Sequence, residues 1–202
     1  MSKATGDQEQ MHELLYQALQ TEQGGVLVYQ TALKCAVNDG LRQEWTEYLT
    51  QTRHHVEVVE NLFSELGLDS ATITPGRKVV DHIGKSLVQA MEMALSTGDM
   101  RSAELVATEC VCLAETKDHA NWELIGHYAK HVKGRESKAL MAAFEEVEPD
   151  EDHHLYHTKG WSRELWIESL GLPAVLPPPE EIRQVQTAIG ASRAEHARDK
   201  ML

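Results

Sequence analysis

The sequence predicts an all-α protein, built as an antiparallel four-helix bundle with a long helical crossover between its second and third helices. Of its 202 residues 42% are hydrophobic but only 5% are aromatic. Ala, Leu, Glu, Gln and Met, which favour helices over strands, are frequent. Two closely joined helices, a crossover of about thirty residues and a second closely joined pair have the connectivity of such a bundle.

The first pair of helices is expected over residues 7–37 and 41–66. The sequence "NDG" separates them, and Gly40 is predicted to end the first helix in the left-handed conformation. Gly67 is predicted to end the second helix in the same way. The stretch "LDSATITPG" then reads as a connection, and the amphipathic sequence that follows it predicts a crossover helix over about residues 77–97.

The second pair is expected over residues 100–133 and 136–170, separated by Gly134. Pro149 falls inside the second of these helices, where a proline acts as a kink or a restart. Gly171 is the predicted stop, so the bundle domain spans residues 1–171. Residues 172–202 add a stiff Pro-rich linker, "LPAVLPPPEE", and a polar, Ala-rich helix over residues 180–199.

Charge and hydropathy exclude several classes of function. The formal net charge of −13 would repel nucleic-acid phosphates and anionic membrane surfaces. No apolar run approaches the roughly 18 residues of a membrane helix, and the first residues lack an apolar signal region. We therefore expect a cytoplasmic protein with no nucleic-acid or membrane partner. Its three cysteines, Cys35, Cys110 and Cys112, have no metal-type spacing and are expected to be reduced.

Acids and histidines interrupt the apolar seams of all four bundle helices. In the last of them, apolar residues spaced alternately four and three apart lead through Val147 to Glu151 and His154 and on to Trp161. An inert bundle would place Leu or Ala at these two positions. Residues that interrupt a seam or share its face in this way are Glu22, His55, Glu115, Asp118, Glu151 and His154.

These interruptions also lie at matching heights. Positions 22 and 55 average to 38.5, inside the first turn, and positions 115 and 154 average to 134.5, beside Gly134. At roughly 1.5 Å of rise per residue, each interruption lies about 25 Å from its turn. The polar groups are therefore expected to meet in one layer, where unpaired carboxylates would cost several kcal/mol each. A pair of Fe or Mn ions would neutralise that layer, and Zn²⁺ also accepts carboxylate and imidazole ligands.

Over roughly residues 11–166, the sequence resembles the ferritin-like di-iron carboxylate superfamily, most of all rubrerythrin-type bundles. Three motifs carry the resemblance: "EQGGVLVY" with Glu22 and Tyr29, "ETKDH" with Glu115 and Asp118, and "FEEVEPDEDHH" with Phe144, Glu151 and His154. The crossover and "TRHHVEVVENLFSELG" also look similar to a stress-associated bacterial branch of ferritin-like proteins.

The resemblance implies a centre of two Fe or Mn ions that reacts with dioxygen or peroxide, as an oxidase, peroxidase or ferroxidase. It makes Tyr29 a candidate for a supporting or redox role, although a buried core tyrosine with a bonded hydroxyl is the simpler interpretation. No Cys-x-x-Cys motif is present, so electrons would come from an outside donor or from ferrous iron as substrate. A homodimer is expected.

The second helix departs from the family pattern, which has Glu three residues before the histidine. Thr52 takes that place before His55, and Gln51 before His54. Two alternatives therefore stay open. One is a degenerate, metal-free bundle with a hydrogen-bonded polar layer that serves as an oligomeric stress or scaffold protein. The other is a mononuclear Zn or Ni bundle enzyme that uses three histidines, such as His55, His154 and His119.

Overall fold

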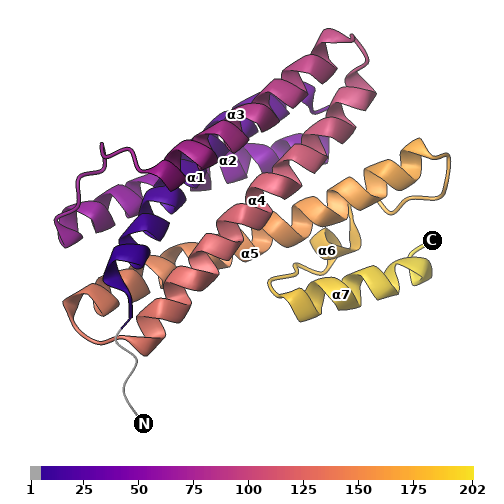
Figure 1. The fold of residues 1–202 in the computed structure, drawn as a ribbon. Coiled ribbons are helices and arrows are strands. Elements are labelled where there is room, and N and C mark those ends of the chain that lie inside the picture. Colours follow the sequence, from indigo (N-terminus) through magenta and orange to yellow (C-terminus); the bar gives the residue numbers. More distant parts are fainter. Residues whose placement is uncertain (1–5) are drawn as a thin grey trace.

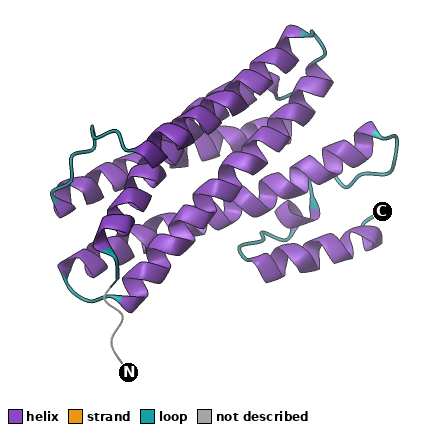
Figure 2. Ribbon diagram, viewed as in Figure 1, coloured by secondary structure: helices purple, strands orange, loops and turns teal. Residues whose placement is uncertain are grey.

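The computed structural model describes residues 6–202, and within them it contains helices and loops but no strand (Figure 2). The predicted all-α class is confirmed. The helices, in chain order, are α1 (Gln8–Cys35), α2 (Asp39–Leu66), α3 (Pro75–Ser96), α4 (Met100–His131), α5 (Arg135–Ser169), α6 (Pro179–Ile182) and α7 (Ala188–Ala197), followed by a 3₁₀ turn at Arg198–Lys200. In these same residues no helix has both the length and the apolar character needed to cross a lipid bilayer.

Four long helices pack in a closed ring. Helix α1 contacts α2 and α4, and α5 contacts the same two helices from the other side (Figure 1). Helix α3, in the crossover, packs outside this ring against α1 and α4. The C-terminal helices α6 and α7 lie against α5 (Figure 1). The ring has one interior, to which all four long helices contribute side chains.

Two apolar clusters fill that interior, one on each side of a polar layer. The first cluster takes residues from 11–19 of α1, 58–63 of α2, 122–129 of α4 and 139–147 of α5. The second cluster lies on the other side of the layer and takes residues from 28–36, 41–49, 103–111 and 161–165. On every long helix the acids and histidines of the seam fall between the two clusters. The polar layer is therefore closed off from solvent above and below by packed apolar side chains.

Glycines let the helices approach closely next to this layer. A Cβ added at Gly25 would lie 3.2 Å from Cγ2 of Thr52 in α2, and one added at Gly84 of α3 would lie 3.8 Å from Cα of Gly24. Helix α3 is further tied to α1 by the buried Arg77, which donates hydrogen bonds to side chains of α1. The crossover helix is thus packed onto the side of the bundle.

The turn between α1 and α2 differs from the predicted one. Gly40 does not end α1 in a left-handed conformation but lies in the first turn of α2. Helix α1 ends at Cys35, and the side chain of Asn38 caps α2 by accepting hydrogen bonds from the amides of Gly40 (2.9 Å) and Leu41 (3.2 Å). An Asn at this position satisfies amides that the helix leaves free. The turn is therefore built by a side-chain cap rather than by a glycine.

The C-terminal segment also differs from expectation, because the single helix predicted over residues 180–199 is broken. Helix α6 ends at Ile182, Gln184 has a φ of 48°, and α7 begins only after Thr187, which caps it. Between them Val185 is buried and its carbonyl accepts a hydrogen bond from Nε2 of His157 at 2.8 Å. This contact with the bundle takes the place of the hydrogen bond that the Val185 carbonyl would accept in a continuous helix. Pro149, in contrast, lies inside α5 without ending it.

Candidate metal centre

The polar layer holds two overlapping groups of carboxylates and imidazoles. Glu22 of α1, His55 of α2 and Glu151 of α5 form one group, and Glu115 of α4, Glu151 and His154 form the other. Within each group, the ligand atoms all lie within 4.8 Å of one another. All five residues are buried. Glu151 belongs to both groups, so the two triads could hold two metal ions that share one carboxylate.

Both imidazoles turn Nδ1 toward the acids. Nδ1 of His55 lies 3.1 Å from Oε1 of Glu151 and 3.7 Å from Oε2 of Glu22. Nδ1 of His154 lies 3.6 Å from the same oxygen of Glu151 and 3.5 Å from Oε2 of Glu115. One carboxylate oxygen of Glu151 therefore faces both rings.

The opposite ring nitrogens are held by two polar residues outside the triads. Nε2 of His55 lies 3.1 Å from Oδ2 of Asp150, and Nε2 of His154 lies 2.9 Å from Oε1 of Gln51. The Gln51 amide is oriented by a second bond, in which its nitrogen donates to Asp150 at 3.1 Å. Since these oxygens only accept, Nε2 carries the hydrogen in both rings. In the neutral imidazoles the lone pair is then on Nδ1, facing the acids, and such partners orient metal-binding histidines.

Each of the five residues has a buried ligand atom without a hydrogen bond. Among the residues that the structure describes, the buried atoms of the two triads with no hydrogen-bond partner are Oε2 of Glu22, Nδ1 of His55, Oε2 of Glu115, Oε2 of Glu151 and Nδ1 of His154. Buried polar atoms in folded proteins are nearly always paired. Five unpaired atoms from five residues in one layer are ones that a single bound group could satisfy together.

The electrostatics of the layer favour a cation. Burial, and next the Glu115 carboxylate, raise the pKa of Glu151 to about 7. Burial alone would lower the pKa of His55, but the neighbouring carboxylates of Asp150, Glu151 and Glu22 raise it far above its usual value. Without a metal, protons thus collect among these groups. A metal ion would displace these protons and supply the positive charge that the carboxylates need.

Asp118 and Tyr29 lie beside the two triads rather than in them. Asp118 is buried with Oδ1 unpaired, and burial followed by the charge of Glu22 raises its pKa. Tyr29 is fully buried, its ring lies edge-on to His154 with centroids 6.1 Å apart, and its hydroxyl has no hydrogen-bond partner in the described chain. Burial, and next Glu115, raise the pKa of Tyr29.

Thr52 of α2 takes the place of the glutamate expected from the resemblance, and its side chain faces Gly25 of α1. It is buried and its hydroxyl donates to the carbonyl of Tyr48 at 2.8 Å, so it supplies no ligand to the layer. The predicted group of three histidines does not form either. His119 bonds through Nε2 to Asp152 at 2.8 Å, and its Nδ1 lies 3.7 Å from Glu123, away from His55 and His154.

Three residues that contact the candidate ligands are not predicted by the sequence pattern. Asp150 and Gln51 lie off the apolar seams, although each orients a histidine. Trp122 belongs to the apolar seam, yet its Nε1 donates to Oε1 of Glu22 at 2.8 Å. Each of these contacts joins different helices, and helical periodicity carries no signal for such pairing. The sequence pattern does not predict a second group of ligand-type side chains, around His157, either.

Comparison with family models, with curated proteins and with solved structures finds no match to this chain.

Proposed function

We propose that this protein is a ferritin-like bundle that binds two transition-metal ions, Fe or Mn, in its polar layer. One ion would be held by Glu22, His55 and Glu151, and the other by Glu115, Glu151 and His154. The observation that carries the proposal is the set of five buried, unpaired ligand atoms in two triads that share Glu151. Carboxylates with imidazoles are the donors that Fe and Mn take in helical bundles.

Charge balance supports two ions rather than one. The three glutamates of the triads contribute three negative charges, and two divalent ions contribute four positive ones. Asp118, buried beside the triads and interacting with all three glutamates, would bring the balance to neutrality when ionised. A buried site whose charges cancel avoids most of the cost of desolvation. We therefore assign Asp118 the role of a counter-charge rather than a direct ligand.

The proposed chemistry is redox, of the oxidase, peroxidase or ferroxidase type. When bound, Fe or Mn supplies positions for dioxygen or peroxide and an exchangeable electron. The protein's part is to hold the imidazoles through Asp150 and Gln51, to exclude water with the apolar clusters on both sides, and to place the Tyr29 ring beside His154. Electrons would come from an outside donor, or ferrous iron itself would be the substrate.

A second candidate function is a metal-free bundle that serves as a stress or scaffold protein. The observation that favours it is Thr52, whose hydroxyl bonds the backbone of its own helix where the resemblance leads us to expect a bridging acid. In that case the contacts between His55, His154 and Glu151 would hold protons instead of metal.

Elemental analysis separates the two candidates. The full chain is purified without a His-tag, stripped with chelator, loaded anaerobically with Fe(II) or Mn(II), desalted and analysed. The dimetal proposal expects two Fe or Mn per chain and, after air is admitted to the Fe form, a near-ultraviolet absorption that the stripped protein lacks. Loaded protein with no Fe or Mn after desalting would overturn the dimetal proposal and leave the metal-free bundle.

A further inference from the structure

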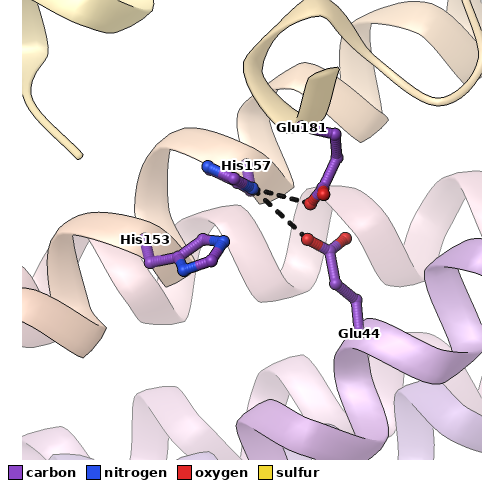
Figure 3. Close-up of side chains that lie close together, drawn as sticks. All are labelled: Glu44, His153, His157 and Glu181. Carbon is purple, nitrogen blue, oxygen red and sulfur yellow. Dashed lines mark hydrogen bonds and ion pairs between the residues drawn. The ribbon is translucent and has the colours of Figure 1, made fainter. Parts of the chain in front are cut away.

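A second group of ligand-type side chains lies where the C-terminal segment meets the bundle. It consists of Glu44 from α2, His153 and His157 from α5, and Glu181 from α6 (Figure 3). One ligand atom from each of the four lies within 4.8 Å of the others. Three separate helices therefore converge on one point, outside the two triads of the polar layer.

His157 directs its Nδ1 atom at this point. Its side chain is buried, and its Nε2 lies 2.8 Å from the carbonyl oxygen of Val185. A carbonyl only accepts, so Nε2 carries the hydrogen and Nδ1 of the neutral ring carries the lone pair. Nδ1 lies 2.6 Å from Oε1 of Glu181 and 3.4 Å from Oε1 of Glu44 (Figure 3). A lone pair facing two carboxylates requires a positive charge between them, either a proton or a metal ion.

The other two members of the group complete a set of donors. The Tyr48 hydroxyl donates to Oε1 of Glu44 at 2.8 Å, while Oε2 of Glu44 is buried and has no hydrogen-bond partner among residues 6–202. The ring of His153, one helical turn before His157, lies against it with centroids 3.7 Å apart (Figure 3). The group thus offers two imidazoles from α5 and one carboxylate each from α2 and α6. Imidazole nitrogens and carboxylate oxygens are ligands that Zn²⁺ binds.

We infer that Glu44, His153, His157 and Glu181 form a mononuclear site for a divalent transition ion of the Zn²⁺ class, which ties the C-terminal segment to the bundle. Tetrahedral ligands at about 2.0–2.1 Å from Zn²⁺ lie about 3.3 Å apart. Glu181 would therefore move outward slightly from its contact with His157. It is able to do so because it is half-buried on the four-residue helix α6.

This site stands independently of the proposed dimetal centre, although the two are neighbours. Tyr48 joins them, since its ring lies over His154 with centroids 4.2 Å apart while its hydroxyl bonds Glu44. None of the four ligands belongs to the two triads. A substitution in one site can therefore remove its metal ion while the other site keeps its metal ions.

The test counts Zn²⁺ in the full, metal-stripped chain and in isosteric variants. Glu181→Gln and Glu44→Gln each remove a ligand charge, while the exposed Glu195→Gln and Glu47→Gln are their controls. We expect each site variant to bind one Zn²⁺ fewer than wild type, whether the wild-type count includes the dimetal centre or not. The controls keep the wild-type count, and circular dichroism verifies that all variants are folded.

Limited trypsin digestion gives a second readout at the exposed Arg183, two residues after Glu181. With free Zn²⁺ at about ten times its Kd, cleavage there should slow about tenfold in wild type, because the ion stabilises the docked segment. Glu181→Gln should show no such protection. If Glu181→Gln keeps the full Zn²⁺ count and the protection, the inference is overturned, and the His157–Glu181 contact is an ion pair that holds a proton.

Discussion

The imidazole rings of His55 and His154 lie stacked across the bundle, with centroids 5.8 Å apart and planes 30° from parallel. They come from α2 and α5, and both direct Nδ1 at Oε1 of Glu151, at 3.1 and 3.6 Å. No other carboxylate is shared by the two triads. Glu151 is therefore the residue on which both proposed metal positions depend, and the first prediction tests that dependence.

Glu151→Ala should reduce the Fe or Mn content from two ions per chain to none, because each triad loses a ligand. Glu22→Ala, which affects one triad, should leave one ion. The exposed Glu145→Ala on the same helix as Glu151 is the control and should retain both. Metal content after desalting is the measurement, and full metal content in Glu151→Ala would exclude this centre.

Gln51→Leu should weaken metal binding without removing a ligand. The substitution removes the acceptor that holds the hydrogen on Nε2 of His154. The hydrogen can then move to Nδ1, which would lose the lone pair that faces the centre. Loss of such a partner typically lowers metal affinity by about 10- to 100-fold. Competition with a chelator of known affinity measures the change, with the exposed Gln43→Leu as the control. An unchanged affinity would show that Gln51 does not orient the ring.

Trp122→Phe should lower the free energy of unfolding of the metal-free protein by about 1–3 kcal/mol. The indole nitrogen donates to the buried Oε1 of Glu22, and its removal leaves that oxygen unpaired. Chemical denaturation followed by circular dichroism measures the difference. Trp166→Phe, at a tryptophan that is 39% exposed, should change the free energy far less. Equal effects of the two substitutions would argue that the hydrogen bond adds nothing.

Acid should release the C-terminal segment through Glu164. Burial alone would raise the pKa of this carboxylate, but the Val175 amide and then the Arg198 and Arg163 guanidinium groups hold it below its ordinary value of 4.5. Because the folded pKa is lower than the unfolded one, the contribution to stability is complete above pH 4.5. It is lost as the pH falls below that value toward the folded pKa.

Hydrogen exchange followed by mass spectrometry tests this behaviour. Protection of residues 172–200, relative to the bundle, should fall as the pH drops below about 4.5 in wild type. Glu164→Gln should show weak protection at every pH, while the exposed Glu168→Gln should follow wild type. A pH response in Glu164→Gln as large as in wild type would assign the effect to another group.

Most of the helical organisation is readable from the sequence because it is local. The period of 3.6 residues decides which side chains share a face, and the turn residues decide which positions lie level in a hairpin. On these grounds Glu22 and His55 were expected side by side, as were Glu115 and His154. The structure brings each pair within 4 Å. That these groups bind metal stays a prediction.

Local periodicity therefore predicts the all-α class and the set of acids and histidines that face inward. Tertiary structure alone decided which imidazole nitrogen faces the centre, through partners such as Gln51 and His154 that are 103 residues apart. It also decided the break before α7 and the group around His157, whose contact with Val185 spans 28 residues. The physical reason is that side-chain direction along a helix repeats with a fixed local period, whereas contacts between helices depend on how the whole chain packs.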